Sequence, residues 1–206
     1  EILGDNKNII WRYNISVGDG TRETGVLRPE GGKSQHPGRT IHVSDYSRPL
    51  RKQSEGVHIY NNTYVVTSNS TPGIELNGKD INVWNNLFVV EKDAYLGRNI
   101  NVVWSKDDPV DVRGNVFSGS VSQKFLALDN NALKAQLSFD DDQKRAESYA
   151  LSVEQVNRFA TGQPVINPSF PAAGKGIFDH VSEVADTDFF GNTISHLPGF
   201  VGAGYK

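Results

Sequence analysis

Four segments of the chain share one pattern of apolar and polar positions. They align without gaps over residues 9–17, 57–65, 81–89 and 110–118. Each segment has apolar residues at positions one and three, Asn at position six, and usually an apolar or aromatic residue at position eight. Alternation over so few residues, punctuated by Gly and Asn, predicts short β-strands at regular spacing.

The asparagines at position six set the length of the repeat. They are Asn14, Asn62, Asn86 and Asn115, so the successive spacings are 48, 24 and 29 residues. The first spacing is twice the second, which indicates either a repeat without the Asn or a repeat enlarged by a loop. A shorter strand is predicted before each segment, at residues 2–5, 41–43, 74–77 and 100–102, with Ile2 equivalent to Ile74.

A repeat of about 24 residues with two or three short strands is the unit of a parallel β-helix, in which each coil stacks on the next. Asn suits a sharp corner because it tolerates a left-handed backbone, and its amide can hydrogen-bond the neighbouring coil. We therefore predict an all-β parallel β-helix. An antiparallel sandwich with incidental Asn turns is the alternative.

The segment 74–88 reads Ile-x-Leu-x-Gly-x-x-Ile-x-Val-x-Asn-Asn-x-Phe. This pattern resembles the right-handed parallel β-helix proteins of the pectate-lyase-like superfamily, and the resemblance covers residues 1 to about 118. Residues 164–176 and 188–191 resemble the closing segment of many secreted bacterial members, and 200–205 match their tail loosely. The resemblance implies the fold and a secreted, periplasmic or cell-surface location, and says less about the substrate.

We expect residues 1–120 to form the coils and residues 121–206 to form a capping segment of the same domain. The capping segment contains a predicted short helix at 152–159, with Ser152 as N-cap and Gln155 at the capping-box position. Glu1 falls inside a repeat, and a first coil would expose an open apolar cross-section. We therefore expect earlier coils upstream in the same polypeptide, against the alternative of a short uncapped strand.

The composition of the chain argues against several classes of binding partner. The net charge of −3, from 21 basic and 24 acidic residues, argues against nonspecific nucleic-acid binding. No apolar run approaches the roughly 18 residues that span a bilayer, so no membrane partner is predicted. Cysteine is absent, which excludes disulfides and thiolate metal sites. No metal or cofactor motif is evident in the sequence. The acidic run at 140–142 is interpreted as a solvated charge run. If the protein is a polysaccharide lyase, one of the alternatives below, Ca²⁺ is a possible cofactor.

Stacked coils would align equivalent outward side chains in columns. Position four carries two aromatic residues flanked by two arginines, which suits sugar rings and their carboxylates or sulfates. The alternative is that another segment covers Tyr60 and Trp84. The predicted substrate-binding residues are Arg12, Arg39, His58, Tyr60, Trp84 and Arg113.

The preceding strand offers a second outward column of His42, Glu75 and Asn101, beside a long interruption at residues 18–38. Long loops on a rigid scaffold often carry catalysis, although any one of these charges is more simply a solvated loop residue. The candidate catalytic residues are Asp19, Arg22, Glu30, His36, His42 and Glu75.

These residues favour an enzyme acting on an acidic or decorated polysaccharide. The leading prediction is a glycoside hydrolase, with its two carboxylates drawn from Asp19, Glu30 and Glu75. The first alternative is a polysaccharide lyase, in which a base removes the proton α to a uronate carboxylate. The second alternative is a non-catalytic glycan-binding β-helix, such as a tail-spike or adhesin stalk.

Overall fold

The computed structural model describes residues 1–20, 38–46, 49–103, 109–129 and 131–137, with the short stretches 152, 155, 187–193 and 202–203. The described chain is mostly β-structure, and all of its paired strands run parallel. This confirms the predicted all-β class and excludes the antiparallel sandwich for this part of the chain. No helix among the described residues is long and apolar enough to cross a membrane.

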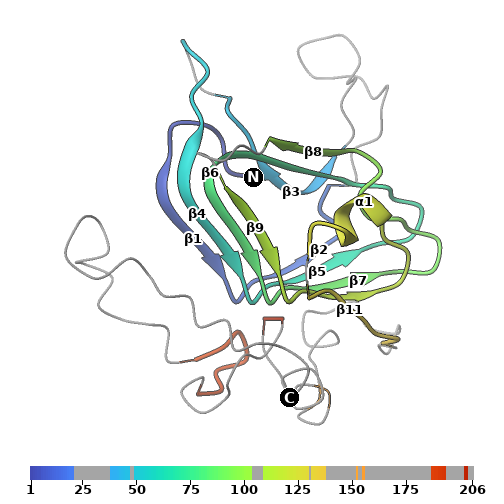
Figure 1. Cartoon of the computed structure of the whole chain (residues 1–206). Coiled ribbons are helices and arrows are strands. Elements are labelled where there is room, and N and C mark those ends of the chain that lie inside the picture. The colour runs from blue at the N-terminus through green and yellow to red at the C-terminus, as the bar shows by residue number, and fades with distance from the viewer. Residues whose placement is uncertain are drawn as a thin grey trace, which may run out of the picture.

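The strands form three layers around one interior (Figure 1). The first layer contains β3 (Arg39–Val43), the start of β6 (Gly73–Trp84) and β8 (Ile100–Val103). The second layer contains β1 (Lys7–Arg12), β4 (Ser54–Tyr60), the end of β6 and β9 (Val110–Arg113). The third layer contains β2 (Ile15–Val17), β5 (Thr63–Val66), β7 (Leu87–Val90), β10 (Val116–Ser118) and β11 (Leu133–Lys134).

The register of the second layer confirms the four-segment alignment. Ile9 pairs with Val57, Val57 with Ile81, and Ile81 with Val110. Because β1 lies directly beside β4, the 48-residue spacing is one repeat enlarged by a loop. Ile2 differs from the prediction. It bridges Val43, which pairs with Leu76, so Ile2 is equivalent to Leu76 rather than to Ile74.

The asparagines form a hydrogen-bonded ladder at the corner between the second and third layers. Nδ2 of Asn14 donates to Oδ1 of Asn62, and the same bond joins Asn62 to Asn86 and Asn86 to Asn115, each at 3.0 Å. The ladder ends on Asp129, whose Oδ2 accepts Nδ2 of Asn115 at 2.7 Å.

The left-handed backbone at this corner belongs to the residue before each ladder Asn, which corrects the predicted role of Asn itself. Tyr13, Asn61, Asn85 and Gly114 have φ values of 54°, 52°, 52° and 64°. The ladder side chains therefore hold the corner by hydrogen bonding, and their neighbours make the turn.

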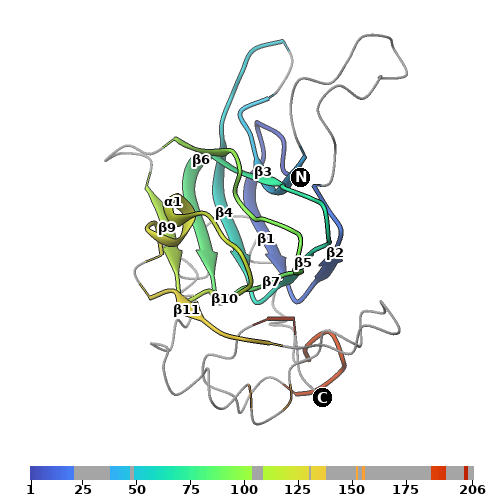
Figure 2. The ribbon, with the colours of Figure 1, turned by 90° about the vertical axis from the view of Figure 1, so that its right-hand side faces the viewer.

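Aromatic side chains fill the interior and close one end. The rings of Tyr64, Phe88 and Phe117 stack at centroid distances of 5.2 and 5.1 Å. Phe125, from the short helix α1 (Gln123–Leu126), packs edge-on against Phe88 and Phe117 at 5.7 Å. The helix lies at the end of the molecule opposite β1 and β2 (Figure 2).

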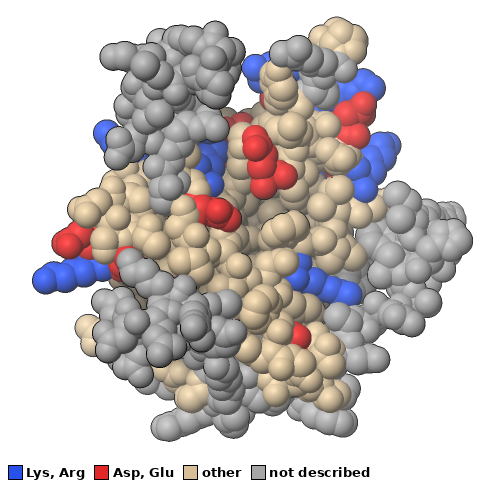
Figure 3. Space-filling model, turned by 180° about the vertical axis from the view of Figure 1, so that it is seen from behind, with Lys and Arg blue, Asp and Glu red and all other residues tan. Residues whose placement is uncertain are grey.

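The opposite end is formed by β1 and β2, and few charged side chains lie near its centre (Figure 3). Trp11 occupies an inward position of the second layer, in register with Ile59. It is nevertheless 47% exposed, because β1 is the edge strand of this layer among the described residues.

Described residues after 120 cover both an end and a side of the structure. Phe125 and Asp129 lie at the end, as above, whereas Gly202 and Ala203 lie along the outer face of the third layer. The N–H of Gly202 donates to the carbonyl of Asn85 at 3.0 Å, and that of Ala203 donates to Oγ1 of Thr63 at 2.9 Å. Ser152 and Gln155 exchange the two hydrogen bonds of the predicted capping box. The rest of the predicted helix at 152–159 lies outside the described residues.

Candidate functional site

A β-bulge at the start of β3 places Arg39 on the outer face of the first layer. Arg39 pairs with Gly73 and Ile41 with Ile74, so Thr40 is an extra residue without a partner in β6. Regular alternation would put Arg39 on the same side as the buried Ile41. The bulge turns it outward instead, as bulges beside functional sites often do.

Arg39 forms an ion pair with Glu75 beside His42. Its Nη2 lies 2.7 Å from Oε2 of Glu75. The same carboxylate oxygen lies 3.7 Å from Nε2 of His42, and Oε1 of Glu1 lies 2.9 Å from Nδ1 of His42. His42, Glu75 and Asn101 are aligned across the layer, which confirms the predicted column.

The surroundings of His42 favour the neutral imidazole. Burial lowers the pKa of His42 below its ordinary value of 6.5, and Arg39 lowers it further, while Glu75 and Glu1 act in the opposite direction. The ring therefore remains uncharged at neutral pH and can accept a proton. The contact with Glu1 favours the tautomer with the proton on Nδ1, which leaves the lone pair of Nε2 available.

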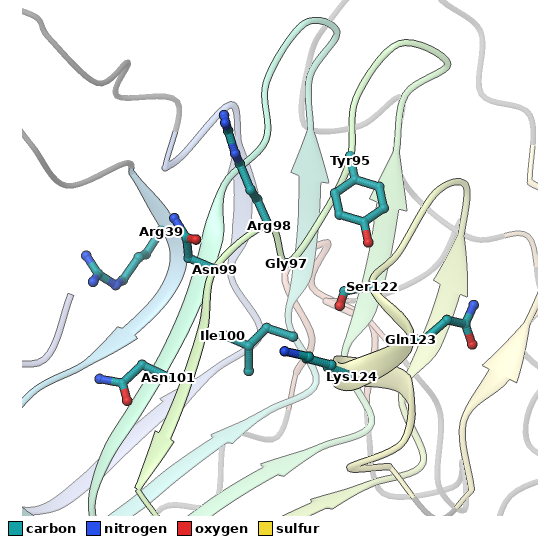
Figure 4. A pocket seen from close by; sticks show the side chains of 10 residues that line it. All are labelled: Arg39, Tyr95, Gly97, Arg98, Asn99, Ile100, Asn101, Ser122, Gln123 and Lys124. Atoms are coloured by element: carbon teal, nitrogen blue, oxygen red, sulfur yellow. The ribbon is translucent and has the colours of Figure 1, made fainter.

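A pocket of about 510 Å³ opens next to this cluster (Figure 4). Arg39 belongs to both, and Asn101 extends the column from Glu75 into the pocket wall. The wall also includes Tyr95, Arg98 and Lys124, and no Asp or Glu is found among its described residues. It is therefore a cationic recess beside a proton acceptor.

Gly20, near the start of the interruption at residues 18–38, lies beside the bulge of β3. Gly20 lies so close to Arg39 that an added Cβ would stand 2.3 Å from the Arg39 carbonyl carbon. Asp19, one residue earlier, accepts a hydrogen bond from the hydroxyl of Ser16. The other predicted catalytic residues of this loop, Arg22, Glu30 and His36, lie outside the described residues.

The predicted binding column of the second layer has the expected register, with Arg12, Tyr60, Trp84 and Arg113 in adjacent positions. Tyr60 is only 3% exposed, and its hydroxyl accepts a hydrogen bond from Nη1 of Arg12 at 3.0 Å. Nε and Nη2 of Arg113 donate to the two carboxylate oxygens of Asp111. Tyr60 is therefore covered, as the alternative expected. Arg12 and Arg113 each already hydrogen-bond to another side chain of the protein.

His58 lies on the same second layer and is 7% exposed. Its Nδ1 is 3.2 Å from Nδ2 of Asn82, and burial lowers its pKa while Asp80 opposes the shift. Of the six predicted binding residues, only Arg39 joins His42 and Glu75.

Sequence reasoning missed most of the pocket wall, including Tyr95, Arg98, Asn99 and Lys124. Arg98 lies two residues before the predicted strand at 100–102. Its closeness to this strand was the one signal from which its place beside Asn101 could have been predicted. Lys124 falls in the section after residue 120, where the repeat no longer indicates which residues lie side by side.

The lyase alternative would bring a calcium ion, which binds to clusters of oxygen ligands. The described residues contain no cluster of three or more His, Asp or Glu side chains that could hold a metal ion. The carboxylate of Glu75 is already paired with Arg39.

No protein-family model, no curated protein and no solved structure matches this chain. Its function is therefore argued from its own geometry.

Proposed function

We propose that the three layers are the three faces of a right-handed parallel β-helix, in which each coil contributes a strand to each face, and that the protein is a secreted or cell-surface enzyme acting on an acidic polysaccharide. The parallel register and the Asn14–Asn115 ladder support the fold. The observation that carries the function is the contact of His42 with the Arg39–Glu75 ion pair, on an outer face next to a cationic pocket.

This arrangement suits β-elimination better than hydrolysis. Nε2 of His42 takes the proton α to a uronate carboxylate, and the released electron pair forms the carbon–carbon double bond. The glycosidic C–O bond then breaks, and its oxygen takes a proton from solvent. Arg39 faces the carboxylate on which negative charge develops, and a fixed cation stabilises such charge.

Glycoside hydrolysis remains the second candidate because two carboxylates flank His42, with Glu1 at Nδ1 and Glu75 at Nε2. A hydrolase needs one carboxylic acid to protonate the leaving oxygen and one carboxylate to act as base or nucleophile. Oε2 of Glu75 lies 2.7 Å from Nη2 of Arg39 and 3.7 Å from Nε2 of His42, so we assign Glu75 to the second of these roles.

A panel of acidic and neutral polysaccharides distinguishes these reactions. We expect polygalacturonate, alginate or chondroitin sulfate to yield the ultraviolet absorbance of an unsaturated uronate, while xylan and cellulose remain intact. New reducing ends without that absorbance would indicate hydrolysis. Binding without either product would contradict the enzyme proposal and favour a glycan-binding β-helix.

His42→Gln tests the assigned base, and His58→Gln is its matched control. Removing a general base lowers the rate by about 10²–10⁴-fold. His58 is also a histidine with a pKa lowered by burial, but it lies on the second layer, so its variant should retain nearly full kcat/KM. Thermal melts of both variants separate loss of catalysis from loss of fold. Equal activities for the two variants would remove His42 from the mechanism.

A further inference from the structure

The cationic pocket beside His42 has a ligand preference of its own. Its volume of about 510 Å³ lies within the range of about 300–1,000 Å³ that is typical of small-molecule sites. Segments 95–101 and 122–124, together with Arg39, form its wall. Figure 4 shows the Lys124 side chain extending toward Ile100, across the floor of the recess.

Positive charge predominates in the wall. The chain as a whole carries a net charge of −3, yet the described residues that line the pocket include Arg39, Arg98 and Lys124 and no carboxylate. Only Arg39 is paired with an acidic group of the described chain, through Glu75. Arg98 contacts the Thr71 hydroxyl at 3.5 Å, which leaves most of its guanidinium donors for a ligand.

Polar and aromatic groups complete a surface suited to a sugar. Asn99 and Asn101 supply amides that can both donate to and accept from hydroxyl groups. Tyr95 is 39% exposed at the edge of the pocket, where its ring can stack on a pyranose face. An inorganic anion alone would use only the cations and would not need these groups.

We propose that this pocket is a subsite for an anionic sugar, one that carries a carboxylate or a sulfate ester, adjoining the reacting sugar at His42. Arg98 and Lys124 bind the anionic group, and Asn99 and Asn101 bind the ring hydroxyls. This inference rests on the proposed action on an acidic polysaccharide and narrows the substrate to a chain with charge on neighbouring sugars.

Binding of small probes tests the subsite independently of catalysis. The probes are glucuronate, glucose 6-sulfate, glucose and inorganic sulfate, titrated into the whole chain and followed by amide chemical shifts of Gly97, Asn99 and Asn101. We expect both charged sugars to shift these amides and glucose to leave them unchanged. Sulfate alone should bind more weakly than glucose 6-sulfate, because the amides and Tyr95 then lack a partner.

A charge-matched pair of double variants provides the control. Arg98→Gln with Lys124→Gln should weaken binding of the charged sugars by roughly tenfold or more, since each removes a charge-assisted contact. Lys92→Gln with Lys134→Gln changes the net charge equally at exposed lysines that do not line the pocket, and should leave binding unchanged.

The outcomes separate the subsite from the reaction. Probe binding that depends on Arg98 and Lys124 supports the subsite even where no polysaccharide is cleaved, in which case the proposed enzyme activity fails by itself. Cleavage with no probe binding, and with full activity in the Arg98 and Lys124 variant, would overturn the subsite. Equal weakening in both double variants would also overturn it, because binding would then follow net charge.

Discussion

Asn86 shows how one buried side chain joins three neighbouring repeats. It is fully buried, and its Nδ2 donates to the Ile59 carbonyl and to Oδ1 of Asn115, both at 3.0 Å. Its Oδ1 accepts the main-chain N–H and Nδ2 of Asn62, also at 3.0 Å. A carboxamide satisfies this set because it both donates and accepts.

Asn86→Ala should therefore destabilise the fold strongly. The substitution removes the side-chain acceptor of the buried Asn62 N–H and Nδ2, and one donor each to the Ile59 carbonyl and Oδ1 of Asn115. A buried group left unsatisfied costs about 1–3 kcal/mol. We expect the free energy of unfolding to fall by about 3 kcal/mol or more, measured by urea denaturation. Asn101→Ala, at an exposed position, should change it by less than about 0.5 kcal/mol. Similar losses for the two variants would contradict the role of the ladder.

The pKa of His42 should move in opposite directions when its two charged neighbours are removed. Arg39 lowers this pKa and Glu75 raises it, on top of the lowering by burial. Arg39→Gln should therefore raise the pKa of His42, and Glu75→Gln should lower it further, as followed by NMR titration of the ring. Because the base must be unprotonated, the acidic limb of kcat/KM should shift to higher pH in the first variant and to lower pH in the second. Shifts of the same sign would show that the local charges do not control His42.

Ladder residues were predictable at this scale because each repeat places Asn at the same position. Asp129 was not, because it differs in type and follows Asn115 by only 14 residues. Its carboxylate accepts the main-chain N–H groups of Gly114, Asn115 and Asn131. It can end the ladder because the last member only needs to accept.

At the scale of elements, the register of the strands could be predicted from the sequence, whereas the β-bulge in β3 could not. Alternation of apolar residues fixes which side chains of β4, β6 and β9 face inward, so the outward position of Tyr60 and Trp84 followed from the sequence. The bulge at Thr40 breaks that alternation at one residue. Its effect on Arg39 depends on pairing with Gly73, a partner distant in sequence.

The turn after β10 tests how closely neighbouring repeats approach. Gly119 has a φ of +97°, and a Cβ there would stand 2.1 Å from the carbonyl oxygen of Val90. Gly191 has a φ of +85° with nothing within 4 Å of the added Cβ. Backbone strain is similar at the two positions, but of the two only Gly119 meets the backbone of the preceding repeat.

Gly119→Ala should cost more stability than Gly191→Ala. Strain alone costs about 1 kcal/mol, and we expect overpacking to add a further 1–3 kcal/mol at Gly119. Urea denaturation of the two variants measures the difference directly. Equal free energies of unfolding would mean that the third layer can separate at this turn without cost.

At the scale of the whole molecule, the predicted residues fall on two different faces. His42, Glu75 and Arg39 share the first layer, whereas Arg12, Tyr60, Trp84, Arg113 and His58 share the second. A column pattern assigns residues to a face but does not show which face stays open. That depends on contacts such as Arg12 with Tyr60 and Arg113 with Asp111, whose side-chain geometry no repeat encodes.

The pocket arises at the same scale. It brings Arg39 of β3 together with the segment before β8 and with α1. Arg39 and Lys124 are 85 residues apart in the sequence. No local pattern connects these positions, and α1 lies where the repeat has already faded. Stacking the last repeat under α1 creates the recess beside His42.

The measurement that tests the central claim most directly is the product of an acidic polysaccharide incubated with the whole chain and with its His42→Gln variant. We predict that the wild-type chain generates the ultraviolet absorbance of an unsaturated uronate from at least one acidic polysaccharide, and that His42→Gln reduces this rate by about 10²-fold or more while His58→Gln does not. Absence of any cleavage across the panel, or an unchanged rate in the folded His42→Gln variant, would contradict the account.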